Sequence, residues 1–260
     1  MLLAAGDIAT CPGRDDEATA DLLAAQLTEH PDAVIAAVGD LAYERGTAAD
    51  FKQCFAPSWG RFHDRIRPAA GNHEYGTGVA TDYFDEWGDR AGPAGKGWYS
   101  YDLGAWHVVV LNSNCGVPSV GGCGPDSEQG KWLAADLAAH ANRCSLAYWH
   151  HPRWSSGLHG SQPSVDSFWQ AMVAAHVDVV VNGHDHHYER FASVSGVREF
   201  VVGTGGAPRY PVAGPEANSE VWHSGTPGVL RLTLHAASYD WRFLAAADGA
   251  FTDEGSTPCT

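Results

Sequence analysis

An α/β layered domain is the fold class that this sequence of 260 residues predicts. Short apolar runs, often rich in β-branched residues, alternate along the chain with longer segments of helical pattern. Hydrophobic residues make up 44% of the chain and charged residues 18%, a composition that suits a globular protein with a large core. Alternation of strand and helix favours a sheet whose right-handed crossovers place the helices on the outside.

Apolar runs mark the expected strands along the chain. Those in its first part are typical of buried strands: Leu2–Gly6, Ala33–Val38, Val108–Leu111, Leu146–Trp149 and Val177–Val181. From about Val194 onward strands prevail, and we expect them at Phe200–Val202, Val229–Leu234 and Ser238–Ala245. Between these later strands, the Gly/Pro-rich segment Gly203–Gly228 predicts a long loop, a feature that is often functional in compact domains.

Three segments between the early strands have helical patterns. They are Asp15–Thr28, Ser127–His140 and Ser164–Ala175. The second helix has Leu133 and Leu137 on one face, and Pro125, Asp126 and Gln129 supply its expected start signal. The sequence shows no internal repeat, low-complexity tract or interdomain linker.

The charge of the chain limits its partners. A formal net charge of -15 gives a surface field that repels nucleic acids and anionic membranes. An anionic substrate would need strong local positive charge, which bound metal ions can supply. No stretch approaches the roughly 20 apolar residues of a membrane span. We therefore expect a small-molecule partner and no nucleic acid or membrane; the oligomeric state is left open.

The cysteines indicate the compartment. None of the six lies in a CxxC pair, which argues against a zinc ribbon. Their even number and loop positions favour disulfides, with free buried thiols as the alternative. Cys115 and Cys123 flank a Gly/Pro-rich loop and are the easiest pair to join; the other pairings stay open.

The apolar residues after Met1 are too few for a signal peptide, so we expect a cytosolic protein or one whose signal has been removed. The disulfides favour the second, an extracytoplasmic or secreted location.

Five polar clusters each follow, or nearly follow, a buried strand. They are Gly6-Asp7, Gly39-Asp40-Leu41-Ala42-Tyr43, Gly71-Asn72-His73-Glu74, His150-His151-Pro152 and Gly183-His184-Asp185-His186. The carboxyl ends of strands are where α/β sheets place their sites, and glycine allows the sharp turns that aim side chains into a shared cavity. Carboxylates, an amide oxygen, imidazoles and a phenol are ligands for metals such as Fe, Zn and Mn.

Together and in this order, the five clusters resemble the calcineurin-like metallophosphoesterase superfamily, and within it the purple acid phosphatases. The resemblance spans Asp7 to Arg190, about seven-tenths of the chain. It implies a four-layer α/β/β/α sandwich of two mixed sheets flanked by helices, formed by a single catalytic domain over residues 1–260. It also implies two metal ions bridged by Asp40. The first would be held by Asp7, Asp40, Tyr43 and His186, and the second by Asp40, Asn72, His150 and His184.

Two details of the resemblance favour the purple branch. Many relatives begin with Asp-x-His, whereas this chain has Asp7-Ile8-Ala9, and alanine cannot bind a metal. Tyr43, three residues after Asp40, would replace that ligand, and its phenolate suits Fe(III), with Zn, Fe or Mn in the second site. The alternative for Tyr43 is a core tyrosine with a hydrogen-bonded hydroxyl. The second detail is the sequence that starts at Gly183-His184 and ends at Tyr188-Glu189-Arg190, which is similar to the corresponding motif of purple phosphatases.

The resemblance implies hydrolysis of phosphate monoesters by attack of a metal-bound hydroxide. Two cations suit this reaction, because they can activate water and stabilise the charged transition state. The resemblance assigns His73 to substrate binding or to protonation of the leaving group, with Glu74 orienting it. His159, in a Gly/Ser loop, resembles a second histidine that contacts substrate. His151 is the alternative to His150 as a metal ligand.

Three other functions remain open from the sequence. A phosphodiesterase, or an enzyme that accepts monoesters and diesters, would use the same metal ligands and differ in the shape of its loops. A more remote alternative is a non-catalytic secreted binding protein on a hydrolase scaffold. The third is a protein that binds one metal ion or scavenges metal.

Overall fold

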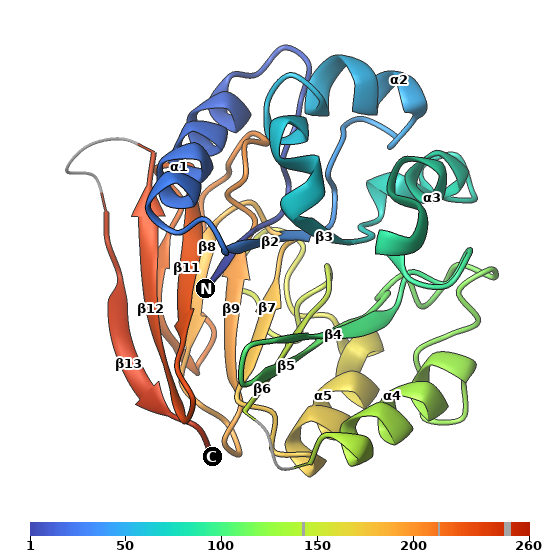
Figure 1. The fold of residues 1–260 in the computed structure, drawn as a ribbon, viewed down its shortest axis with the longest axis vertical. Coiled ribbons are helices and arrows are strands. Elements are labelled where there is room, and N and C mark those ends of the chain that lie inside the picture. Colours follow the sequence, from blue (N-terminus) through green and yellow to red (C-terminus); the bar gives the residue numbers. More distant parts are fainter. Residues whose placement is uncertain (142–143, 213, 247–250) are drawn as a thin grey trace.

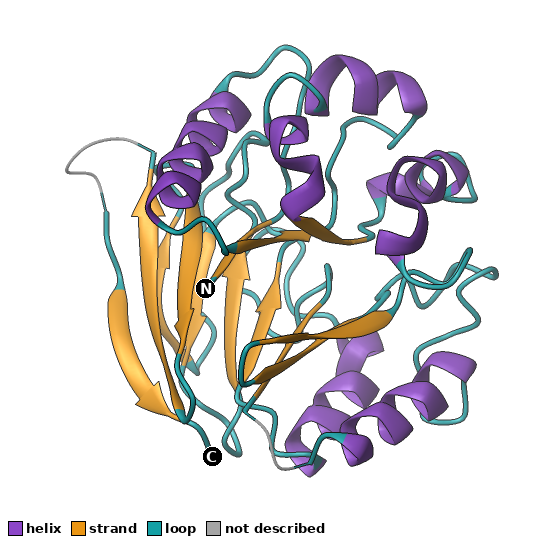
Figure 2. Cartoon of the chain, in the orientation of Figure 1, coloured by secondary structure: helices purple, strands orange, loops and turns teal. Residues whose placement is uncertain are grey.

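Two mixed β-sheets lie face to face in the computed structural model, which describes residues 1–141, 144–212, 214–246 and 251–260. Helices pack on the outer side of each sheet, so that the chain forms four layers (Figure 1, Figure 2). This architecture confirms the α/β/β/α sandwich implied by the family resemblance.

The first sheet is built from both ends of the chain. Its strands, in spatial order, are β13 (Glu254–Pro258), β12 (Ser238–Ala245), β11 (Gly228–Leu234), β1 (Leu2–Ala5), β2 (Val34–Val38) and β3 (Ile66–Ala69). β1, β2 and β3 are parallel, whereas β11 pairs antiparallel with β1 and continues into the antiparallel β12 and β13. All four residues of β1 are buried, as expected for a strand that is covered on both faces.

The second sheet comes from the middle of the chain. In spatial order its strands are β10 (Ser219–His223), β8 (Tyr188–Phe191), β9 (Arg198–Val202), β7 (Val179–Asn182), β6 (Ser145–Tyr148), β5 (Trp106–Val110) and β4 (Tyr99–Leu103). β5, β6, β7 and β9 are parallel, so their carboxyl ends meet at one edge of the sheet. β4 and β8 add to this parallel centre in antiparallel pairs.

The helices fall into two groups. On the side of the first sheet lie α1 (Asp15–Glu29), α2 (Ala48–Asp50), η1 (Phe51–Phe55), η2 (Trp59–Arg65), η3 (His73–Tyr75), α3 (Thr81–Trp87) and η4 (Gly88–Ala91). On the side of the second sheet lie α4 (Glu128–Ala139), η5 (Pro163–Val165) and α5 (Asp166–Ala174).

The start of α4 differs from the prediction. The cap is Ser127, whose hydroxyl accepts a hydrogen bond from the backbone N–H of Gly130. Gln129 takes no part in capping, because its side-chain amide pairs with both backbone groups of Asn112 beyond β5. Leu133 and Leu137 are buried, so the predicted apolar face is confirmed.

All eight predicted strands are present within two residues at each end, and the three predicted helices correspond to α1, α4 and η5 with α5. The prediction of one continuous loop over Gly203–Gly228 is wrong, because β10 lies inside it at the edge of the second sheet. The segment 203–218 before β10 has no helix or strand among its described residues.

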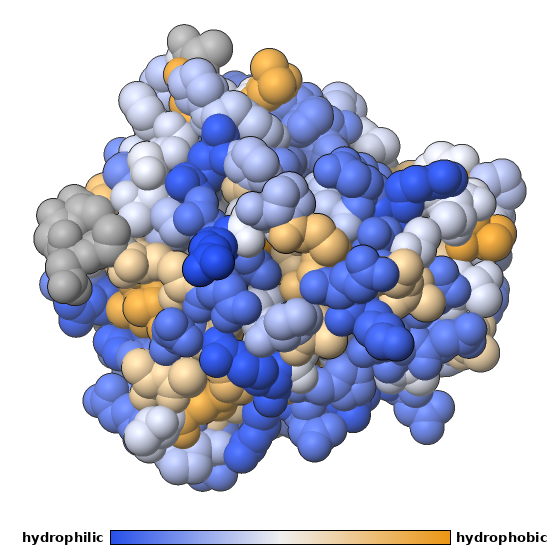
Figure 3. Space-filling view, turned by 90° about the horizontal axis from the view of Figure 1, so that it is seen from above, coloured by the Kyte–Doolittle hydropathy of each residue, from blue (hydrophilic) through white to orange (hydrophobic). Residues whose placement is uncertain are grey.

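Three disulfides join parts of the chain that are 8, 43 and 115 residues apart. Cys115–Cys123 is present, as the sequence indicates, together with Cys11–Cys54 and Cys144–Cys259. In the described part of the chain, no helix has the length and apolar character needed to cross a membrane. On the face shown in Figure 3, hydrophilic residues predominate and hydrophobic residues form small, separate patches.

Candidate metal centre

Strand ends bring the predicted ligands to one place. Asp7 follows β1 and Asp40 follows β2, and both have left-handed backbones, with φ values of 58° and 50°. His184, just after β7, has a φ of 72°. Such values are uncommon for residues other than glycine and cluster at functional sites. Neighbouring glycines leave the space required, since a Cβ on Gly71 would overlap the Asp40 carboxylate.

The Tyr43 hydroxyl lies at the centre of the first group of donors. It is 3.1 Å from Oδ1 of Asp7 and 3.3 Å from Oδ2 of Asp40. Nε2 of His186 is 3.1 Å from the same hydroxyl and 3.4 Å from Oδ1 of Asp7. The other three residues predicted for the first metal therefore each have a donor atom within 3.3 Å of the Tyr43 hydroxyl.

His150 holds the same central position in the second group. Its Nε2 is 3.1 Å from Oδ2 of Asp40 and 3.1 Å from Oδ1 of Asn72. Nδ1 of His184 lies 3.3 Å from that nitrogen. Asp40 belongs to both groups, because its Oδ2 contacts both Tyr43 and His150.

Backbone carbonyls fix the direction of two imidazoles. Nδ1 of His150 donates to the carbonyl oxygen of Val38 at 3.0 Å, and Nδ1 of His186 donates to that of Pro208 at 2.8 Å. With Nδ1 protonated, the lone pair of Nε2 points into the cluster, as in histidines that bind metals. The donors thus fit one or more cations, which would relieve the close contacts between lone pairs.

The electrostatics of the cluster also suit a cation. Burial lowers the pKa of His184, and the nearby His150 lowers it further, so that the ring is neutral and able to bind a metal. Burial acts to lower the pKa of His150 as well, but the Asp40 carboxylate outweighs it and raises the pKa to about 10. Burial, followed by Asp7 and Asp40, raises the pKa of Tyr43 far above its ordinary value. A bound cation would take the place of the protons that His150 and Tyr43 otherwise hold.

Glu74 does not orient His73, contrary to our expectation. Its buried carboxylate accepts hydrogen bonds from the backbone N–H groups of Asp40 (2.9 Å), Leu41 (2.8 Å) and Gly71 (2.7 Å). Glu74 therefore holds together the loops that carry Asp40 and Asn72. Burial and the nearby Asp40 raise the pKa of Glu74 to about 7.

His73 is oriented by the backbone instead. Its Nδ1 donates to the carbonyl oxygen of Glu44 at 2.6 Å, which leaves Nε2 facing Oδ2 of Asp40 at 3.9 Å. The ring packs on Tyr43, with centroids 4.3 Å apart, and its side chain is 30% exposed. His73 is thus positioned at the rim of the cluster, within reach of a molecule bound there.

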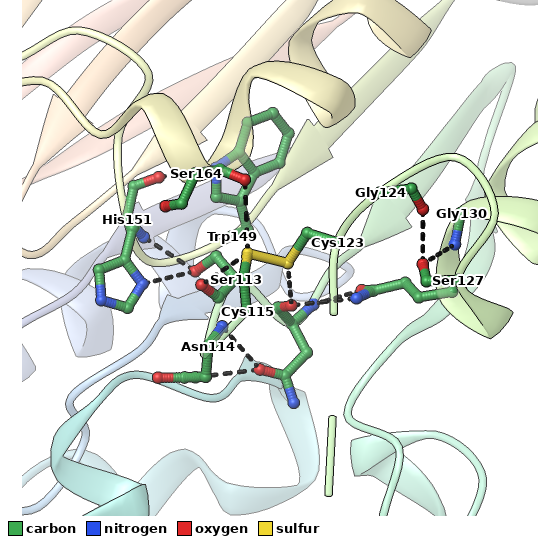
Figure 4. Close-up of a disulfide and its surroundings, with 12 residues drawn as sticks. Ser113, Asn114, Cys115, Cys123, Gly124, Ser127, Gly130, Trp149, His151 and Ser164 are labelled. Carbon is green, nitrogen blue, oxygen red and sulfur yellow. Dashed lines mark hydrogen bonds between the residues drawn. A yellow bond between two sulfur atoms is a disulfide. The ribbon is translucent and has the colours of Figure 1, made fainter. Parts of the chain in front are cut away.

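His151 lies beside the cluster but points elsewhere. Its Nδ1 is 2.8 Å from Oγ of Ser113, and its backbone N–H donates to the same oxygen at 3.0 Å (Figure 4). Burial, and then the neighbouring His150, lowers the pKa of His151 to about 3.

Asn114, next to Ser113, donates to the carbonyl oxygens of Ala70 and Gly71. The segment that contains Ser113 thus supports the loops of both sheets around the cluster.

His159 and Tyr210 lie beside the histidines of the cluster. The exposed His159 has its ring centroid 4.5 Å from that of His184. Tyr210, which the sequence did not single out, stacks on His186 with centroids 4.8 Å apart and an angle of 27°. The only hint was its position in the long Gly/Pro-rich segment.

Two further groups of described residues bring metal-binding side chains together, but neither suits a metal. The rings of His107 and His140 stack at 3.6 Å and 11°, so their in-plane lone pairs run nearly parallel and do not converge. In the other group, near Asp178, the sulfur atoms of Cys144 and Cys259 are joined in a disulfide. The cluster around Asp40 is therefore the candidate metal centre.

A family model described as calcineurin-like phosphoesterase matches residues 2–188 of the chain. The chain is 26% identical over 251 residues to purple acid phosphatase 15 of Arabidopsis thaliana, which covers 81% of this chain and 45% of the relative. It is 31% identical over 182 residues to an uncharacterized protein of Mycobacterium tuberculosis, which covers 58% of this chain and 33% of that protein.

Among solved structures, purple acid phosphatase PPD1 from yellow lupin (Lupinus luteus) seeds has the same fold. It aligns with a TM-score of 0.81 at 20% identity, over 99% of this chain and 53% of that chain. The chain spans about half, or less, of the length of these three relatives.

Proposed function

Because this chain belongs to the calcineurin-like phosphoesterase family, we propose that it hydrolyses phosphate monoesters at a centre of two metal ions. The observation that carries the proposal is the convergence of two groups of donor atoms that share Asp40. In the first site the ligands are Asp7, Asp40, Tyr43 and His186, and in the second they are Asp40, Asn72, His150 and His184.

The metals we propose are Fe(III) in the first site and Zn, Fe or Mn in the second. The phenol of Tyr43 supports Fe(III), because a phenolate is a hard anionic ligand and the buried hydroxyl has two carboxylates beside it. The similarity to proteins named purple acid phosphatases supports the same branch of the family. When bound, the two cations would supply a nucleophilic hydroxide from water and positive charge for the phosphoryl oxygens.

The residues at the rim would then handle the substrate. His73 is held by Glu44 through Nδ1, so that its Nε2, when protonated, can donate to the oxygen of the leaving alcohol. His159 is exposed beside His184, with ring centroids 4.5 Å apart, and would contact the phosphoryl group or the leaving group. Substrate charge would be met by this local site, since the chain as a whole carries a net charge of -15.

The three disulfides support an oxidising compartment. We therefore place the activity outside the cytoplasm, in a secreted or extracytoplasmic protein.

The proposed activity is tested by turnover of 4-nitrophenyl phosphate and of bis(4-nitrophenyl) phosphate by protein loaded with two metals. We expect a kcat/KM at least about tenfold higher for the monoester, a difference of about 1.4 kcal/mol in transition-state stabilisation. A preference for the diester would assign the protein to phosphodiesterases. Absence of turnover with both compounds, with metals bound, would revive the non-catalytic alternative.

A further inference from the structure

Asp185 lies between two proposed metal ligands, His184 and His186, but its carboxylate points into the protein. Its side chain is completely buried, and no lysine or arginine is among the hydrogen-bond partners of its oxygens in the described part of the chain. Instead, these oxygens accept hydrogen bonds from two separate loops. Because a buried carboxylate requires hydrogen-bond donors, these contacts fix the positions of both loops.

The first loop is Ser155–His159. The Ser155 hydroxyl donates to Oδ2 of Asp185, and the backbone N–H of His159 donates to Oδ1 at 2.8 Å. Between them, Gly157 passes so close that a Cβ there would overlap the carboxylate. The carboxylate thus holds both ends of the loop by hydrogen bonds. In this position the ring centroid of His159 lies 4.5 Å from that of His184.

The second contact reaches Tyr210. Its hydroxyl donates towards Oδ1 of Asp185 at 3.3 Å and towards the carbonyl oxygen of His184 at 3.2 Å. The Tyr210 ring stacks on His186 and meets the His159 ring edge to face, with centroids 5.8 Å apart. His159 and Tyr210 therefore form one continuous wall beside the metal centre, and the same oxygen atom of Asp185 supports both.

We propose that Asp185 is a positioning residue, whose carboxylate fixes His159 and Tyr210 as a wall of the substrate pocket. This inference rests on the proposed function of the metal centre. Its specific consequence is that Asp185 acts on substrate through His159, and that Tyr210 is a second substrate-facing side chain.

The loop has an independent anchor, which makes the inference testable. Both the backbone N–H and the hydroxyl of Ser156 donate to the buried carboxylate of Glu189. Loss of the Asp185 carboxylate should therefore free His159 without releasing the whole loop.

The test is a double-mutant cycle between Asp185→Ala and His159→Ala, measured on protein loaded with metals, with 4-nitrophenyl phosphate as substrate. We expect each single variant to raise KM by roughly tenfold with a smaller effect on kcat, and both to keep their metal content. The double variant should have a KM no more than about threefold above that of His159→Ala, because both changes remove the contact of His159 and only the contribution of Tyr210 is left for Asp185→Ala to remove. Independent, multiplicative effects would overturn the inference, and so would loss of metal from Asp185→Ala.

Two further variants separate positioning from stability. Asp185→Asn keeps an acceptor oxygen for His159 and can donate to Ser155, so its KM should return to within about twofold of wild type. Asp178 is a matched control, since its buried carboxylate also accepts backbone N–H groups, from Ser145 and Thr260, at the opposite end of β6 and β7. Asp178→Ala should leave KM unchanged. An equal rise of KM in Asp178→Ala would show a general loss of rigidity and overturn the inference.

Tyr210→Phe serves if Asp185→Ala does not fold. It removes only the hydroxyl, and we expect KM to rise about threefold, whereas an unchanged KM would overturn the role of this wall. If the metal-loaded wild type shows no turnover, the proposed function itself has failed. Binding of inorganic phosphate, measured by calorimetry, then tests the pocket: weaker binding in Asp185→Ala than in Asp178→Ala supports the inference, and equal binding contradicts it.

Discussion

At the scale of single residues, Asp40 connects the two halves of the site. Its Oδ2 contacts both Tyr43 and His150, the central residues of the two donor groups. We expect Asp40→Ala to lower kcat by at least about a thousandfold. It should also lower the content of each metal below one ion per chain, because removal of a shared ligand weakens both sites.

Elemental analysis and turnover of the same sample check this expectation. Asp64→Ala is the control, since the Asp64 side chain is 94% exposed and forms ion pairs with the partly exposed His63 and Arg90. If Asp40→Ala retains near-full turnover, the ligand assignment is wrong.

His73 should act differently from a ligand. Its ring is held by the Glu44 carbonyl oxygen and lies at the rim, where it can protonate a leaving group. We expect His73→Ala to keep both metals and to slow hydrolysis by about a hundredfold for alkyl phosphates, but less for nitrophenyl phosphate, whose leaving group needs no proton. A steady-state comparison across leaving groups tests this role. Equal loss for good and poor leaving groups would exclude proton donation.

Single residues also mark the limit of the sequence. The glycines and polar side chains that follow the apolar runs predict which residues lie together in the site, because the carboxyl ends of the strands are where α/β sheets place their sites. Glu74 could not be placed in this way, since its partners are backbone N–H groups that leave no trace in the sequence. Tyr210 was missed for a similar reason: its loop has no period, and its place depends on Asp185.

At the scale of elements, His107 joins β5 to two neighbours. Its Nδ1 lies 3.1 Å from Asp102 of β4, and its Nε2 lies 2.8 Å from Asp136 of α4. Burial acts to lower the pKa of His107, but the hydrogen bonds and charges of Asp136 and Asp102 outweigh it and raise the pKa. Such a group contributes stability that is fully present below its unfolded pKa of about 6.5 and is lost as the pH rises through the folded value.

We therefore expect His107→Asn to lower the free energy of unfolding by about 1–3 kcal/mol at pH 6 and by less at pH 9. Urea unfolding of metal-free protein at both pH values measures the difference. His176→Asn, at an exposed turn with a φ of 56°, is the control and should show no such trend. A loss for His107→Asn that is the same at both pH values would mean that the charged pair contributes nothing.

The strands that the sequence missed share a physical cause. Four of the five (β3, β4, β10 and β13) are edge strands, and the fifth, β8, is next to an edge. Edge strands are covered less completely, so their sequences need no continuous apolar run; β13 reads Glu-Gly-Ser-Thr-Pro. Central strands such as β1 and β7 are buried along their whole length and were predicted for that reason.

At the scale of the whole molecule, the disulfides should differ in their effect on stability. Cys144–Cys259 spans a sequence separation of 115, whereas Cys115–Cys123 spans 8. Loop-closure entropy predicts a loss of about 4–5 kcal/mol when the longer link is removed by double serine substitution, against about 2–3 kcal/mol for the shorter. Guanidinium unfolding of the two double variants, after chelation of metals, tests the order. A larger loss for the shorter link would contradict the entropic origin.

The two-sheet architecture could not be predicted from local sequence patterns. Alternation of strand and helix predicts a layered α/β fold, but it does not divide the strands between two sheets or place β11 beside β1. Those pairings join residues more than 220 positions apart, such as Leu3 and Arg231. The family resemblance implied the two sheets but not which strands pair within them.

Metal content, measured by elemental analysis together with the visible spectrum of the same purified sample, tests the central claim most directly. We expect two metal ions per chain, including iron, and an absorption band from charge transfer between the Tyr43 phenolate and Fe(III). Fewer than one metal ion per chain, even after reconstitution, would contradict the assignment of this cluster as a dinuclear centre.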